Sequence, residues 1–162
     1  MANEGKEKNS IFTKSKRMKR PKVQLEEVFP SELPKVNKPV FEYLIWWLKN
    51  EYPKQPDGFH MQEFECAIDG VCGTVRCLSG WLYHLYEIPM DSINDYDQEL
   101  YGTSFKEESE LPHWEWCFGA DWSLTDNTIE GGIKRIEIML EDKIPENWYE
   151  QMTGEAPVEY LN

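Results

Sequence analysis

The chain has 162 residues, enough for one domain or for one domain with a tail, and a formal net charge of −13. Its 40% hydrophobic and 14% aromatic residues, with seven tryptophans, exclude an intrinsically disordered protein. No apolar run approaches the roughly 20 residues of a membrane-spanning helix, and no apolar stretch follows the basic N-terminus as in a secretory signal. We therefore expect a cytoplasmic protein, in the host cytoplasm if it is viral.

The charge divides the chain into two parts. Residues 1–22 hold eight Lys/Arg and two Glu (+6), and the other residues hold nine Lys/Arg and 28 Asp/Glu (−19). We predict a basic arm over 1–22 that is disordered when free, and an extended connector over 23–36 that carries two prolines. The arm is a solubilising tail, a contact for nucleic acid or an acidic surface, or a basic signal like those for nuclear localisation. Its candidate contact residues are Lys14, Lys16, Arg17, Lys19, Arg20 and Lys22.

A single acidic helical domain is predicted over 37–154, followed by a tail over 155–162. Asn37 is a cap candidate for its first helix, which has Pro39 in the first turn and ends before Pro53. The apolar residues there recur at helical spacing. Residues 59–66 fit neither helical nor strand spacing cleanly. The fold class is therefore mainly α, and a short strand near 59–66 would make it α+β.

The segment Cys72–Trp81, CGTVRCLSGW, is predicted to begin the second helix, with Thr74 as its cap. The residues of the segment that we expect to specify the fold are Cys72, Gly73, Thr74, Cys77, Gly80 and Trp81. Leu78, Trp81 and Leu85 share the spacing of a buried helical face. We interpret the segment as structural, with small residues that let a neighbouring element approach.

Shorter elements follow in the acidic and aromatic second half. We expect a short helix over 96–101 ended by Gly102, and a buried loop or short helix over 111–119. A longer helix follows Asn127, which with Glu130 has the form of a capping box. Its solvated side is predicted to carry Lys134, Arg135, Glu137, Glu141 and Asp142. Pro145 opens a last helix that stops at Gly154.

Four cysteines, Cys66, Cys72, Cys77 and Cys117, are the candidate metal ligands, with His60, His84 and His113 as additions. Structural zinc sites take their ligands as close pairs, and only the Cys72–Cys77 spacing comes near that pattern. We therefore expect buried structural thiols and no metal or cofactor, with a small structural zinc domain as an alternative. No nucleophile, phosphate-loop or metalloprotease motif is present, so no catalytic residue is predicted.

The acidic and aromatic composition of the body favours protein binding. Tryptophans beside carboxylates are typical of interface hot spots, and a compact acidic domain attracts basic surfaces. The candidate partner-binding face consists of Asp95, Asp97, Glu107, Glu108, Glu110, Trp114, Trp116 and Trp122. Solubility alone is the competing explanation of the same carboxylates.

One order of motifs resembles a known group. Phe59 and Met61, the segment Cys72–Trp81, then Cys117-Phe118 with Trp122, and finally Ile133 with Arg135-Ile136 follow each other here. This order resembles small uncharacterised bacterial and bacteriophage proteins with a CGTxxCxxGW-type motif, over roughly residues 40–142. Cys117 stands where leucine is usual in that group, and the arm and connector have no counterpart in it. The resemblance implies a phage or bacterial source and a compact helical core, and it transfers no activity.

Together these features lead us to expect a non-enzymatic, phage-encoded interaction protein that binds and modulates a host or viral protein, for example a counter-defence inhibitor. The expected partner is a basic protein surface, because the body carries −19. A virion or nucleoprotein component that uses the basic arm is the alternative. The oligomeric state does not follow from the sequence.

Overall fold

The computed structural model describes residues 16–23, 36–54, 58–61, 66–67, 74–89, 97–102 and 112–160. This part of the chain is mainly helical, as predicted. Its helices are α1 (Lys38–Asn50), the 3-10 helix η2 (Tyr52–Lys54), α2 (Leu78–Leu85), α3 (Asp97–Tyr101), α4 (His113–Phe118), α5 (Trp122–Thr125), α6 (Ile129–Leu140) and α7 (Trp148–Thr153). None of the described helices has both the length and the apolarity needed to cross a bilayer.

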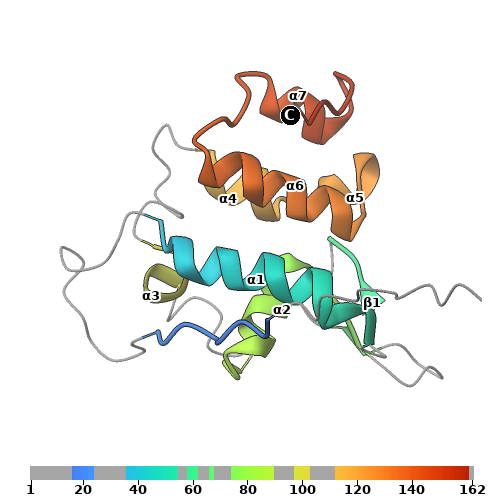
Figure 1. The fold of residues 1–162 in the computed structure, drawn as a ribbon. Helices are drawn as coiled ribbons and strands as arrows, with labels where there is room; N and C mark the ends of the chain where they lie inside the picture. Colours follow the sequence, from blue (N-terminus) through green and yellow to red (C-terminus); the bar gives the residue numbers. More distant parts are fainter. Residues whose placement is uncertain are drawn as a thin grey trace, which may run out of the picture.

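The helices stack in layers around α1 (Figure 1). On one side α1 packs against α6, which in turn packs against α4, and α7 lies beyond α6 and packs against α5 and α4. On the other side lie α2 and the extended residues 16–23, drawn in blue. The N-terminal strip and α7 therefore occupy opposite ends of the molecule.

Helix α1 forms as its spacing predicts. Val40, Leu44 and Leu48 are buried on one face, and Pro39 lies in the first turn, where its missing N–H costs no hydrogen bond. The side chain of Asn37 does not cap the helix, however. Its Nδ2 donates to the Glu99 carbonyl at 3.1 Å, so it ties the start of α1 to α3 instead.

The predicted start of the second helix is wrong. Residues Thr74–Arg76 form strand β3, which pairs in parallel with β1 (Gly58–Phe59) and antiparallel with β2 (Cys66–Ala67). Helix α2 starts after Cys77, whose Sγ accepts a hydrogen bond from the Gly80 N–H at 3.4 Å. The backbone of Thr74 is already extended in the small sheet, so Cys77, three residues later, serves as the cap. The sequence leaves open a short strand near 59–66, and strands β1 and β2 lie at the two ends of that segment.

Helix α6 also begins one residue later than a cap at Asn127 predicts. Thr128 is the N-cap, and its Oγ1 accepts from the Gly131 N–H at 3.0 Å. Asn127 instead accepts a hydrogen bond from the Met61 N–H at 2.8 Å, which holds the segment after β1 against the start of α6. Both residues are good capping types, and the contact with Met61 decides which of them caps.

The core is built from aromatic side chains. Trp81 is fully buried and packs on Trp47, with ring centroids 5.0 Å apart. Phe118 packs against Tyr101 at 5.2 Å. Short helices end as predicted at Gly102 and Gly154, whose φ angles of 102° and 86° lie in the left-handed region that favours glycine.

Residues 155–160, which the sequence predicts as part of a tail, fold back onto the domain. The Glu159 N–H donates to Gln151 Oε1 at 3.0 Å, and Val158 and Tyr160 pack against the core. This return has no periodic signal in the sequence, because it depends on single contacts made by widely spaced residues.

Candidate functional site

Trp116 and Trp122, predicted for the partner-binding face, are core residues. Both are fully buried, and their rings meet edge to face at 5.4 Å. Trp116 Nε1 donates a hydrogen bond to the Arg135 carbonyl at 2.8 Å, and Trp122 Nε1 donates one to the Trp116 carbonyl at 2.9 Å. Buried indole N–H groups with partners are typical of structural tryptophans, so the assignment of these two side chains to a binding surface is corrected.

The rest of that predicted face is only partly described. Trp114 is half-buried and packs on Phe118, with ring centroids 5.0 Å apart. Asp97 is the first residue of α3, but its side chain lies outside the described set, as do Asp95, Glu107, Glu108 and Glu110. Their role in binding stays a prediction.

Exposed apolar side chains occur instead where α5 meets α7. Among the described residues, the large apolar side chains that are exposed are Leu124 (77%) and Tyr149 (53%). They lie on α5 and α7, two helices that pack against each other. Trp148 is half-buried beside Tyr149, with the rings edge to face at 5.7 Å.

Exposed carboxylates lie in α7 and next to the ends of α5 and α7 in the sequence. Asp121, Glu146, Glu150 and Glu155 are all exposed, and we call them, with Leu124, Tyr149 and Trp148, the α5–α7 face. Residues 112–160 contain eleven Asp/Glu and three Lys/Arg, a balance of −8. Of these three cations Arg135 is buried, and Lys143 pairs with Glu141 at 2.6 Å, a contact that lowers the pKa of that exposed carboxyl. The face is therefore strongly acidic.

A buried polar cluster supports this end of the molecule. Arg135, predicted on the solvated side of its helix, is fully buried, and its guanidinium lies 4.4 Å from the ring centre of Trp122. Its Nη1 lies 3.5 Å from Asp126 Oδ2 and donates to the Tyr160 hydroxyl at 2.8 Å. Arginine is buried here because Trp122 and Asp126, at the two ends of α5, and Tyr160 near the C-terminus converge on it, which helical periodicity alone does not reveal.

Tyr160 completes the cluster from the chain's C-terminal region. Its hydroxyl donates to Asp126 Oδ2, while Thr128 Oγ1 donates to Asp126 Oδ1 at 2.5 Å. Burial raises the pKa of Tyr160 despite the opposing effect of Arg135, so the phenol stays a neutral hydrogen-bond donor. Asp126 thus joins the cap of α6 to the buried arginine and to residues 155–160.

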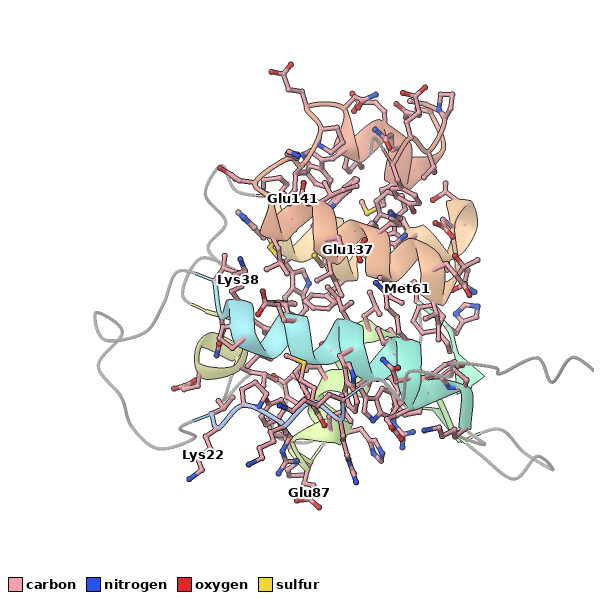
Figure 2. The ribbon with its side chains drawn as sticks, in the orientation of Figure 1. Lys22, Lys38, Met61, Glu87, Glu137 and Glu141 are labelled. Carbon is pink, nitrogen blue, oxygen red and sulfur yellow. The ribbon has the colours of Figure 1, made fainter. Side chains whose placement is uncertain are left out.

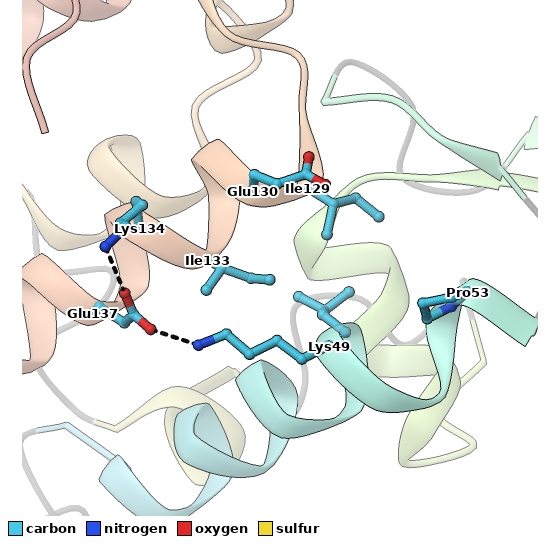
Figure 3. A pocket seen from close by; sticks show the side chains of 8 residues that line it. Lys49, Pro53, Ile129, Glu130, Ile133, Lys134 and Glu137 are labelled. Atoms are coloured by element: carbon cyan, nitrogen blue, oxygen red, sulfur yellow. Dashed lines mark hydrogen bonds and ion pairs between the residues drawn. The ribbon is translucent and has the colours of Figure 1, made fainter. Parts of the chain in front are cut away.

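A groove lies between the C-terminal end of α1 and the start of α6 (Figure 3). It encloses about 400 Å³ above an apolar floor that includes Leu48, Ile129 and Ile133. The charges in its lining cancel, because Lys49 and Lys134 are matched by Glu130 and Glu137. Glu137 contacts Lys49 at 2.8 Å and Lys134 at 3.6 Å. Ligand pockets are usually recognised by a few directed polar groups over an apolar lining. The lining of this groove specifies no class of ligand.

The described thiols do not form a metal or catalytic site. Cys77 and Cys117 are buried, and burial raises the pKa of the Cys117 thiol despite the opposing effect of Arg135, which keeps it protonated and unreactive. In the described ranges no three His, Cys, Asp or Glu side chains are grouped so as to hold a metal ion. The side chain of Cys66 and all of Cys72 and Gly73 lie outside those ranges, so the zinc alternative is not tested there.

The described part of the basic arm has defined contacts. Arg20 donates to the Leu85 carbonyl and lies over the Tyr86 ring, 5.2 Å from its centre. The Tyr86 hydroxyl donates to the Pro21 carbonyl at 2.9 Å. Residues 16–23 therefore lie along the C-terminal end of α2, whereas Lys14 lies outside the described residues.

Comparison of the chain with protein families, with curated proteins and with solved structures gave no match. The resemblance to CGTxxCxxGW-type proteins therefore stays an expectation from the sequence.

Proposed function

We propose that the protein is a non-enzymatic interaction protein and that its α5–α7 face binds a basic surface of another protein. The observation that carries this proposal is the exposure of Leu124 and Tyr149 on two helices that pack against each other, in a part of the chain where Asp121, Glu146, Glu150 and Glu155 are exposed as well. Apolar anchors surrounded by a polar rim are the usual composition of a binding surface. The partner's basic charge follows from the −8 balance of residues 112–160.

The buried cluster behind the face fits this role. Asp126 and Arg135 connect α5, α6 and residues 155–160, so the surface stands on a rigid base. A pre-formed surface loses less conformational entropy on binding than a flexible one. We infer a phage-encoded protein that binds and modulates a host or viral protein, and inhibition of a host defence protein is the specific form that we favour.

The proposal is tested by comparing the tagged protein with two matched variants as baits in bacterial lysate, at about 0.05 M and about 0.3 M salt. Glu146→Lys/Glu150→Lys reverses two charges on the face, and Glu42→Lys/Glu51→Lys reverses two on α1 and at its C-terminal end. A partner that uses the face is retained by the wild type and by the α1 variant, and is lost with the face variant. The partner is then purified, and its Kd for each protein is measured by calorimetry.

The apolar part of the face is tested separately with the purified partner. Leu124→Ser/Tyr149→Ser is expected to weaken binding by at least about tenfold, because anchor residues contribute more than about 1 kcal/mol each. Leu140→Ser, at a half-buried position at the end of α6, serves as the control for a general loss of stability. A partner whose Kd is the same for the wild type and the Leu124/Tyr149 variant would refute this assignment of the binding face.

A further inference from the structure

The described part of the basic arm lies against the C-terminal end of α2. We call residues 16–23 the basic strip. Pro21 and Val23 are half-buried, and Arg20 is turned onto Leu85 and Tyr86. Burial raises the pKa of the Tyr86 hydroxyl to about 12, so it remains the neutral donor that binds the Pro21 carbonyl. The strip is thus anchored by one arginine and by its backbone.

The other four cations of the strip take no part in this anchor. Lys16, Arg17, Lys19 and Lys22 are exposed, and within the described residues none of them pairs with a carboxylate, although the rest of the chain carries −19. Lysines elsewhere on the surface behave differently: Lys38, Lys54, Lys134 and Lys143 each contact a glutamate. The charges of the strip are therefore available to a partner.

The strip and the described segment on which it lies, residues 74–89, are together basic. Residues 16–23 and 74–89 together hold six Lys/Arg and one acid, Glu87. Figure 2 shows Lys22 and Glu87 at the end of the molecule opposite Glu141. A net charge of −13 therefore hides a separation of charge, with a positive side along α2 and a negative side at α6 and α7. A polyanion that approaches the α2 side avoids most of the described carboxylates.

We propose that the basic strip is a second binding site, which takes the sugar-phosphate backbone of a nucleic acid without sequence preference. The strip is extended, so Lys16 to Lys22 span about 20 Å at about 3.3 Å per residue. One strand of a duplex carries a phosphate about every 3.4 Å, and a row of cations of this length faces about six of them. Protein partners usually need apolar or aromatic anchors, whereas the exposed groups of the strip are cations, and charge alone supports nonspecific nucleic-acid binding.

The test uses the full-length protein and a fluorescein-labelled 20-base-pair duplex and 20-nucleotide single strand, with anisotropy measured at several salt concentrations. Four neutralised phosphates predict a slope of log K against log [salt] of about −3 to −4 for the duplex. The variant Lys16→Ala/Arg17→Ala/Lys19→Ala/Lys22→Ala is expected to lose at least about tenfold in affinity at low salt, and most of the slope. The matched control, Lys38→Ala/Lys54→Ala/Lys134→Ala/Lys143→Ala, removes the same charge from other surfaces and should bind like the wild type.

Two results would overturn the proposal. One is wild-type binding that is undetectable at low salt on both nucleic acids, or that falls equally in both quadruple variants. The other is self-association of the wild type that analytical ultracentrifugation shows to be sensitive to salt. If the strip variant abolishes this self-association and added nucleic acid does not compete with it, the strip binds the acidic face of a second copy of the chain. Circular dichroism of both variants confirms that they are folded before they are compared. Failure of the strip would leave the α5–α7 face untouched, because the two are tested with different variants.

Discussion

Two arginines lie over aromatic rings at opposite ends of this molecule, in opposite environments. Arg135 is fully buried, 4.4 Å from the ring centre of Trp122, and contacts Asp126 and Tyr160. Arg20, in the basic strip, is exposed and lies against the end of α2. Its guanidinium is 5.2 Å from the ring centre of Tyr86 and donates to the Leu85 carbonyl. Arg135 thus connects α5, α6 and residues 155–160, whereas Arg20 holds the basic strip on the surface.

The difference separates structural charge from charge available for binding. A buried ion pair is costly to break, because the remaining partner is left as an uncompensated charge away from water. An exposed cation over a ring contributes only about 0.5–1 kcal/mol. We therefore expect the α5–α7 end to behave as a rigid unit, whereas the basic strip can leave its seat at small cost.

The largest effect is expected from Arg135→Ala. Asp126 would keep a largely buried carboxylate, 14% exposed, without its cation, and breaking a buried pair costs about 3–5 kcal/mol. Urea denaturation followed by tryptophan fluorescence measures the free energy of unfolding. Lys134→Ala, one residue away on the exposed side of α6, is the control and should change it by less than about 0.5 kcal/mol. Equal losses for the two variants would mean that the cluster does not hold this end together.

The second effect contrasts two adjacent glycines at the start of α6. A Cβ at position 131 would overlap the carboxylate of Asp126, which Arg135 and Tyr160 hold in place, whereas at position 132 it would lie 2.9 Å from the end of the Leu78 side chain. Gly131→Ala is therefore expected to destabilise the fold by about 1–3 kcal/mol. At Gly132→Ala the gain of about 1 kcal/mol in helix propensity offsets a small shift of Leu78. Thermal unfolding of both variants checks this, and a stabilised Gly131→Ala would show that Asp126 moves freely.

Helices with a strong apolar period could be predicted from the sequence. Residues such as Leu44, Leu78 and Ile136 repeat at the spacing of a buried face, and the prolines and glycines at the ends of α1, α3 and α7 mark where each stops. The residues that cap the helices could be predicted less accurately. Thr74 and Asn127 are good capping residues by type, but strand pairing and the Met61 contact, both long-range, commit them to other partners.

The residues of the proposed binding surface are less evident from the sequence than the helices. Tryptophans close to acidic residues in the sequence indicate an interface by composition. In the fold, however, Trp116 and Trp122 are buried and contact Arg135. The exposed groups, Leu124 and Tyr149, lie on helices of four and six residues, which are too short for a period to show which side faces solvent. The burial of Arg135 likewise depends on Tyr160, 25 residues away in the sequence.

A third, smaller effect is expected from pH. Burial lowers the pKa of His113 on α4, although Asp142 opposes the shift. Because the folded pKa lies below the unfolded value of about 6.5, protonation favours the unfolded chain, and stability falls as pH drops through 6.5 toward the folded pKa. Unfolding measured between about pH 7.5 and pH 5 should therefore show a loss that His113→Gln reduces. A loss of the same size in that variant would assign the pH dependence to other groups.

The smallest effect on global stability is expected for Arg20→Ala. The substitution removes a hydrogen bond and an exposed cation–ring contact, together about 1 kcal/mol, and leaves the core untouched. Its local effect should be larger, because the strip then keeps only the Tyr86–Pro21 hydrogen bond at 2.9 Å and the packing of its half-buried side chains. Limited trypsin cleavage after Lys16, Arg17 and Lys19 should become faster while the unfolding midpoint stays within a few degrees of the wild type.

Lys22→Ala removes a cation from the same strip without removing an anchor, so it should leave cleavage at those three sites unchanged. If both variants are cleaved at the wild-type rate, Arg20 does not hold the strip, and its seat on α2 depends on the backbone and on Pro21 and Val23 alone.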